Sequence, residues 1–202
     1  MNDAIASYNF EGLASAGFYI ALRLGYAYPV AELNALPKSW VDLYTVQGFM
    51  LSDPVLRWVY SNTGAVRWSE IEEADPRGIL DAAKEYGMQF GVTISWQEEG
   101  DRGLRSFGSF LRNDREFTDL EISQLAASLE DLHQSHAPPT NLTNAELEAL
   151  RMVRDGLLMK QVADELGVSL GAVKQRLKNA KQKLRAKTSS QAIALAVEHG
   201  LI

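Results

Sequence analysis

The feature that most constrains this chain is the division of its charge at one short stretch. Residues 1–139 carry 10 Lys and Arg against 20 Asp and Glu, whereas residues 140–202 carry 10 against 6. The change falls at residues 136–141, where Pro138 and Pro139 favour an extended linker. A chain of 202 residues is long enough for two domains. We therefore expect an N-terminal domain over residues 1–135, a linker over 136–141 and a C-terminal domain over 142–202.

Composition excludes several classes of protein. With 46% hydrophobic and 23% charged residues the chain resembles ordinary folded proteins and not disordered ones. No apolar run reaches the roughly 18 to 20 residues that cross a bilayer, and Met1 is not followed by the basic segment of a signal peptide. We therefore expect a cytoplasmic protein without a membrane partner. Cysteine is absent, which excludes disulfides, thiolate metal sites and cysteine nucleophiles.

The sequence of the C-terminal domain predicts four helices. Thr143 and Glu146 have the spacing of a capping box at the start of the first helix, and Gly156 is placed to end it. A short helix is expected over residues 160–166. Ser169 is expected to cap a third helix, and Ser189 or Ser190 a last one. The first helix should bury Leu147, Leu150 and Val153, the second Val162, Ala163 and Leu166, and the last Ala192, Ile193, Ala196 and Val197.

The third helix combines an apolar row with a row of cations. Its apolar row is Val173, Leu177, Ala180 and Leu184, and its cationic row, one residue later, is Lys174, Lys178, Lys181 and Arg185. One residue corresponds to a rotation of about 100°, so the two rows lie on neighbouring faces. Between Gly167 and Thr188 there are seven Lys and Arg and no Asp or Glu. An ordinary solvated helix face would mix both signs, so the row favours a polyanionic partner such as DNA.

These residues resemble a known family. The segments Leu142-Thr143-x-x-Glu146, Leu166-Gly167-Val168-Ser169, Ala172-Val173-Lys174 and Gly200-Leu201-Ile202 are similar to the LuxR-type DNA-binding domain. The resemblance implies a helix-turn-helix whose second helix lies in the major groove of double-stranded operator DNA. The DNA-binding residues that we expect are Lys174, Arg176, Lys178, Asn179 and Lys181.

The N-terminal domain alternates strands with helices. Period-2 alternation predicts strands over residues 18–24, 90–94 and 104–111. Helices are expected over 40–49 behind Ser39, over 55–61 behind Asp53-Pro54, and over 78–86 behind Asp75-Pro76. A second capping box, Thr118 with Glu121, opens a helix that runs to about residue 132. We expect an α/β/α sandwich, and with the four-helix C-terminal domain an α+β fold overall.

No catalytic residue can be assigned. The chain has no Gly-x-Ser-x-Gly elbow, no dinucleotide fingerprint and no phosphate-binding loop. Its three histidines, His133, His136 and His199, are expected at helix ends or in the linker. The acidic cluster around Glu72 is better explained as solvated surface. We therefore expect neither an enzyme, nor a metal site, nor a cofactor.

A set of aromatic residues remains in the N-terminal domain. Trp40-x3-Tyr44, Asp53-Pro54 and Trp68, followed by Gly87-x3-Gly91-Val92-Thr93, resemble the acyl-homoserine-lactone-binding domain that precedes the LuxR-type DNA-binding domain in quorum-sensing regulators. The resemblance implies that the Trp40 indole donates to the lactone carbonyl and that Asp53 accepts the ligand amide. Tyr44 would line the head group, Trp68 would pack on the lactone ring, and Ser109 would reach the acyl carbonyl. Asp53 could instead serve only as a helix cap.

The interpretation is a quorum-sensing transcriptional regulator in which an N-acyl-homoserine lactone controls binding to operator DNA. A homodimer is expected because two recognition helices on a twofold axis read a palindrome, and RNA polymerase is a further candidate partner. The alternative keeps the LuxR-type DNA-binding domain. It makes the N-terminal domain a ligand-independent interaction or dimerisation module with a filled core.

Overall fold

The computed structural model describes residues 8–24, 29–98, 104–137, 139 and 141–202, and these divide into two compact units at residue 136. Pro138 and Thr140 of the expected linker lie outside the described residues. Each unit has hydrophobic clusters of its own, and each is described by itself. None of the helices in the described ranges is long and apolar enough to cross a membrane.

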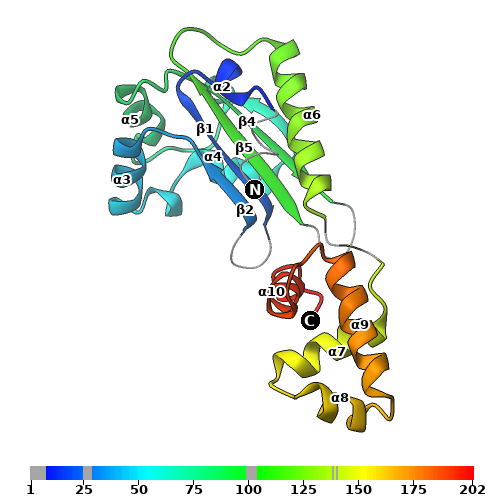
Figure 1. Ribbon diagram of the computed structural model, residues 1–202. Coiled ribbons are helices and arrows are strands. Elements are labelled where there is room, and N and C mark those ends of the chain that lie inside the picture. Colours follow the sequence, from blue (N-terminus) through cyan, green and yellow to red (C-terminus); the bar gives the residue numbers. More distant parts are fainter. Residues whose placement is uncertain (1–7, 25–28, 99–103, 138, 140) are drawn as a thin grey trace. The chain divides into compact units, whose positions relative to one another are not determined.

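The N-terminal unit is built on one antiparallel sheet of five strands in the order β2-β1-β5-β4-β3 (Figure 1). The strands are β1 (Gly17–Leu24), β2 (Pro29–Asn34), β3 (Gly64–Arg67), β4 (Phe90–Gln97) and β5 (Arg105–Arg112). The three central strands were predicted from alternation, whereas the edge strands β2 and β3 were not. Both are short and half-exposed, so their apolar alternation is weak.

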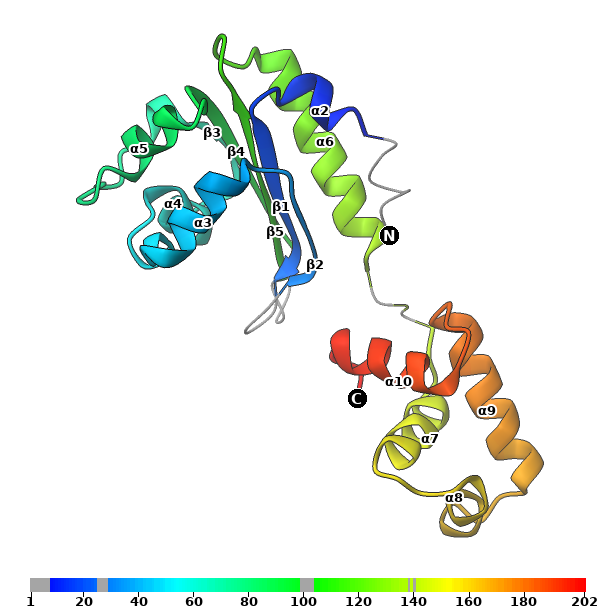
Figure 2. The same cartoon turned by 60° about the vertical axis from the view of Figure 1, so that its left-hand side comes forward.

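Helices cover both faces of this sheet (Figure 2). One face carries α3 (Lys38–Val46), α4 (Pro54–Ser61), α5 (Ile79–Glu85) and the 3-10 turns η1 (Phe49–Leu51) and η2 (Trp68–Glu70). The other carries α2 (Phe10–Leu13) and α6 (Asp119–Ser135). The predicted α/β/α sandwich is therefore confirmed.

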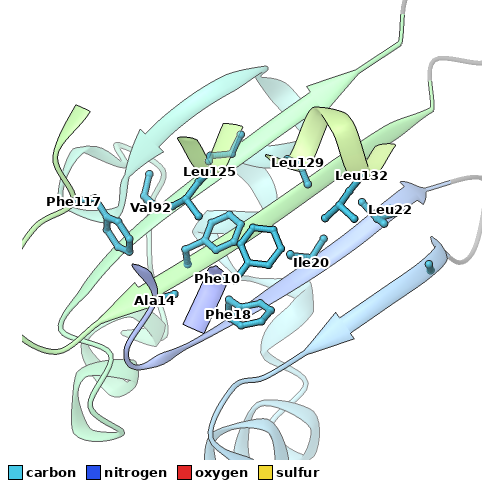
Figure 3. Packing of buried hydrophobic residues seen from close by; sticks show 13 residues of the cluster. Phe10, Ala14, Phe18, Ile20, Leu22, Val92, Phe117, Leu125, Leu129 and Leu132 are labelled. Atoms are coloured by element: carbon cyan, nitrogen blue, oxygen red, sulfur yellow. The ribbon is translucent and has the colours of Figure 1, made fainter. Parts of the chain in front are cut away.

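The α6 face holds the main core of this unit. The rings of Phe10 and Phe18 pack beneath α6, whose Leu125 and Leu129 are fully buried (Figure 3). The ring of Phe110 belongs to the same cluster and lies 5.4 Å from that of Phe10. Alternation along β5 sends Phe110 to this face and leaves its neighbours Ser109 and Leu111 on the other. The face opposite α6 thereby receives Ser109 and its pairing partner on β4, Thr93.

The alternation of β1 does not hold to its end. Arg23 has φ +53° within a β-bulge, and Leu24 beyond it packs on the face opposite to that of Leu22. The buried Arg23 donates to His133 Nε2 (2.7 Å) and to Glu98 (2.7 Å). His133 is completely buried near the end of α6, and burial lowers its pKa. Its second ring nitrogen bonds Ser106 Oγ, so this histidine joins α6 to the sheet.

Two of the three caps predicted for the helices on the face opposite α6 were wrong. Helix α3 begins at Lys38 behind Pro37, without a cap from Ser39, and it ends before Gly48, whose φ of +59° separates it from η1. Helix α5 begins behind Gly78 instead of Asp75, because a turn is inserted there; Asp75 still accepts the N–H of Leu80. The start of α4 behind Asp53 is as predicted.

The C-terminal unit consists of four helices, as predicted: α7 (Asn144–Arg154), α8 (Met159–Glu165), α9 (Leu170–Lys183) and α10 (Ser189–Glu198). The capping box of Thr143 and Glu146 and the cap from Ser169 are both present. In α7 the fully buried positions are Ala149 and Leu150, whereas Leu147 and Val153 are half-buried. Thr188 caps α10 instead of the predicted serines, and Val197 is 48% exposed instead of buried.

Since each unit has its own core, we expect an isolated fragment of residues 137–202 to fold. It should give a helical circular dichroism spectrum and one cooperative thermal transition. Leu150→Ala in that fragment should remove about 2–5 kcal/mol of unfolding free energy, because its side chain is fully buried. A fragment that melts without a cooperative transition would contradict the two-unit description.

Candidate functional site

Asp53 is the central residue of the candidate site. It lies between η1 and α4 and is only 8% exposed. One carboxylate oxygen accepts the N–H of Val55 (2.7 Å), and the other accepts the hydroxyl of Tyr44 (2.6 Å). Burial raises the pKa of Asp53 above its usual value, although these two hydrogen bonds oppose the shift. The carboxylate therefore caps α4 and also ties it to α3.

An aromatic cluster lies beside this carboxylate. Trp40, 4% exposed, faces Tyr44 at 5.8 Å, Phe49 at 6.1 Å and Tyr86 at 5.5 Å between ring centroids. Trp40 and Tyr44 share a face because they are four residues apart on α3. Within the described residues the indole N–H of Trp40 donates no hydrogen bond. The cluster thus holds an unused donor, and one of its members, Tyr44, bonds the buried carboxylate of Asp53.

A chain of hydroxyl groups on the sheet completes the site. Trp68 Nε1 donates to Thr93 Oγ1 (2.9 Å), which lies 2.9 Å from Ser109 Oγ. Thr93 and Ser109 are paired neighbours on β4 and β5 and face the same way as Trp68. Gly91 is required here, because a Cβ at this position would lie 2.3 Å from Cδ2 of the Trp68 ring. Three side chains from distant parts of the chain therefore meet on one face.

The structure brings together all five residues that the resemblance singled out. Trp40, Tyr44 and Trp68 belong to one hydrophobic cluster, Asp53 bonds Tyr44, and Ser109 bonds Thr93 beneath Trp68. Thr93, Phe49 and Tyr86 were not assigned a role from sequence. Thr93 belonged to the quoted Gly-Val-Thr segment, whereas for Phe49 and Tyr86 no spacing signal existed.

The cationic row of α9 forms the second candidate site. Val173, Leu177 and Ala180 are buried against the other helices, while Lys174 and Lys178 are exposed. Lys181, Arg176 and Asn179 are half-buried, and Asn179 accepts a hydrogen bond from Gln175 (2.7 Å). The candidate DNA-binding residues therefore differ in how freely they can reach a partner.

One cation of α9 is occupied within the protein. Lys183 Nζ lies 2.7 Å from a carboxylate oxygen of Glu146 and 2.7 Å from the backbone oxygen of Asn141. Glu146 is only 4% exposed, and the bonds from Lys183 and Thr143 lower its pKa despite the opposing effect of burial. Lys183 thus holds the start of α7 and is not free for DNA.

Comparison with known proteins assigns both units. Residues 1–135 match the family described as autoinducer binding domain, and residues 140–196 match the luxR family of bacterial regulatory proteins. The chain is 28% identical over 181 residues to the transcriptional activator protein VanR of Vibrio anguillarum, covering 82% of this chain and 75% of VanR. It is 26% identical over 188 residues to the quorum-sensing regulator RhlR of Pseudomonas aeruginosa, covering 86% and 77%.

Solved structures agree with this fold. SdiA in complex with octanoyl-rac-glycerol has a TM-score of 0.51 and 25% identity, covering all of this chain and 89% of SdiA. A crystal structure of Escherichia coli SdiA has a TM-score of 0.50 and 24% identity, covering all of this chain and 90% of that one.

The raised pKa of Asp53 predicts how its replacement affects the unliganded protein. A raised pKa means that the Asp53 carboxyl group binds its proton more tightly in the folded protein than in the unfolded chain. The free energy of unfolding therefore falls as the pH rises above about 4, where the carboxyl group of the unfolded chain ionises first. Asp53→Asn removes that dependence and keeps a helix cap. In urea titrations, the variant should gain stability relative to the original protein between pH 4 and 7.

Asp114 provides a control of opposite sign. Its bonds to Arg112 lower its pKa to about 2, so this carboxylate stabilises the folded state once it is ionised. Asp114→Asn should therefore lose stability relative to the original protein at pH 7, and the loss should shrink as pH falls toward 2. The same pH trend for Asp53→Asn and Asp114→Asn would show that Asp53 is not a desolvated carboxylate.

Proposed function

Because this chain belongs to the luxR family of bacterial regulatory proteins and carries an autoinducer-binding domain, we propose that its effector is an N-acyl-homoserine lactone bound between α3, α4 and the sheet. It is a transcriptional regulator and not an enzyme. Lactone binding in the N-terminal unit controls the binding of the C-terminal unit to operator DNA. The buried carboxylate of Asp53 among aromatic rings is the observation that carries the proposal.

The chemistry of the ligand matches the groups of the site. An acyl-homoserine lactone offers one amide N–H, two carbonyl groups besides the ring oxygen, and an apolar tail. Asp53 accepts the amide N–H, because an ionised carboxylate has lone pairs beyond the two that Tyr44 and Val55 use. Trp40 donates its unused indole N–H to the lactone carbonyl, and Ser109 donates to the acyl carbonyl. Tyr44 lines the head group, and Trp68 packs against the lactone ring.

The C-terminal unit is proposed to bind DNA as a helix-turn-helix made of α8 and α9. Lys174 and Lys178 are the exposed members of the row on α9 and reach phosphates or bases, with Arg176, Asn179 and Lys181 at the margin of the contact. Arg185, which was predicted on the same row, lies beyond the end of α9 with φ +53°. The active species is a cytoplasmic homodimer that reads a palindrome and can recruit RNA polymerase. Residues 136–141 serve as the linker between the domains.

Asp53→Asn is the variant that tests the sensor. It exchanges a charged acceptor for a neutral amide, so lactone affinity should fall by about 1.5 to 3 kcal/mol, the worth of a hydrogen bond to a charged group. The measurement is a lactone titration followed by tryptophan fluorescence, with Trp40 and Trp68 as the expected reporters.

Asp114→Asn is the control with the same change of charge. Asp114 is a carboxylate beyond the end of β5, bonded to Arg112, and lies outside the proposed site. Its replacement should leave lactone affinity unchanged. Equal affinity of the original protein and Asp53→Asn would remove Asp53 from the site. A signal that does not saturate with any lactone would instead favour the ligand-independent module.

The cationic row predicts a salt effect on DNA binding. Each phosphate contact contributes about 0.9 to the slope of log affinity against log salt concentration. The double variant Lys178→Ala, Lys181→Ala should therefore bind all DNA sequences more weakly and reduce the slope by about 2. The experiment is a fluorescence anisotropy titration of labelled duplex DNA at several salt concentrations.

A charge-matched control separates contact from net charge. Lys38→Ala with Lys84→Ala removes two positive charges from the N-terminal unit, where both lysines are paired with aspartates. This control should leave the slope unchanged. An unchanged slope in the Lys178→Ala, Lys181→Ala variant would exclude the row from the interface.

A further inference from the structure

A second apolar cluster lies at the far end of α4, away from Asp53. Ala21, Val59 and Phe107 are its buried members, and Tyr19, Leu24, Leu56 and Trp58 pack around them. Phe107 is 5% exposed, and its ring lies 5.7 Å from that of Tyr19. We call these residues the Phe107 cluster. Side chains of the protein itself therefore fill the space between the sheet and the last turns of α4.

The Phe107 cluster lies in line with the proposed ligand site. Helix α4 begins at Asp53, where the ligand amide is proposed to bind, and carries Val59 in its second half. On β5, Phe107 lies two residues before Ser109 on the same face, about 7 Å away by the usual rise of a strand. In the opposite direction along β5, Leu111 is packed in the cluster of Trp40. An acyl chain that leaves Ser109 along the sheet therefore meets the ring of Phe107.

An arginine closes the same end from outside. Arg105 donates to the backbone oxygen of Val59 (2.5 Å), to that of Asn62 and to Ser95 Oγ (2.5 Å). The first two acceptors belong to the end of α4, and Ser95 lies on β4 opposite Phe107. Arg105 thus fastens the last turn of α4 to the sheet, so a longer ligand cannot pass Phe107 by moving this turn unless these bonds break.

We propose that Phe107 limits the length of the acyl chain and that this protein selects lactones with short chains. The inference rests on the proposed lactone site. It attributes the preference for short acyl chains to the Phe107 cluster, which lies outside the head-group region. A short chain ends before the Phe107 ring. A long chain must displace packed side chains, which opposes the gain from burying more of its own methylene groups.

The test compares N-butanoyl-, N-hexanoyl- and N-dodecanoyl-homoserine lactone by calorimetric titration of the full-length protein. The original protein should bind the hexanoyl compound about tenfold more tightly than the dodecanoyl compound, the size of effect expected when a hydrophobic pocket discriminates by methylene groups. Phe107→Ala should remove or reverse this preference. Val59→Ala makes space in the same cluster from the side of α4 and should shift the preference in the same direction. This second variant tests the inference if Phe107→Ala does not fold.

Phe110→Ala is the matched control. Phe110 lies on the same strand but faces α6, so its loss should leave the order of the three lactones unchanged. Tighter binding of the dodecanoyl than of the hexanoyl compound by the original protein would overturn the inference while leaving the lactone site intact. An unchanged order in both Phe107→Ala and Val59→Ala would overturn the role of Phe107. No binding of any lactone would overturn the proposed function itself.

Discussion

A carboxylate that is removed from water must receive hydrogen bonds, and the candidate site depends on how Asp53 receives them. Val55 supplies one at the start of α4, and Tyr44 on α3 supplies the other. The bond from Tyr44 ties α3 to the start of α4, and the ring of Trp40 lies 5.8 Å from that of Tyr44. Asp53 is therefore a structural residue and the proposed ligand acceptor at once. One group serves both purposes because a carboxylate can accept more hydrogen bonds than the helix start requires.

The site is also connected to the last helix of its own unit. Arg67, next to Trp68, donates to the backbone oxygen of Phe117 (3.2 Å) and to Asp119 (2.5 Å) at the start of α6. Helix α6 then continues to Ser135, at the boundary of the two units. In the C-terminal unit, the pairing of Lys183 with Glu146 assigns one cation of α9 to stability and leaves Lys174 and Lys178 exposed. The ion pair with Glu146 therefore makes Lys183 a structural cation, whereas Lys174 and Lys178 remain available to DNA.

Sequence was sufficient where a local rule decided the structure. The capping boxes at Thr118 and Thr143 and the Asp53-Pro54 start all formed, because each depends on residues within three positions. The start of α5 was predicted to within one residue, but its cap was wrong, because a turn ending at Gly78 separates Asp75-Pro76 from the helix. Two features that depend on strand pairing were not predicted, because no local pattern encodes that pairing. One is the bulge in β1 that turns Arg23 toward His133, and the other is the hydrogen bond between Trp68 and Thr93.

The central claim is that a lactone is held by the buried carboxylate and by the unused indole donor of Trp40. The protein has four tryptophans, so its indole N–H groups give a simple proton–nitrogen NMR spectrum that Trp→Phe variants can assign. On titration with N-hexanoyl-homoserine lactone, the indole proton of Trp40 should move downfield and saturate as it gains an acceptor. The Trp68 proton, already bonded to Thr93, should move less. A saturating change that leaves the Trp40 proton in place, or no change in any indole signal, would contradict the account.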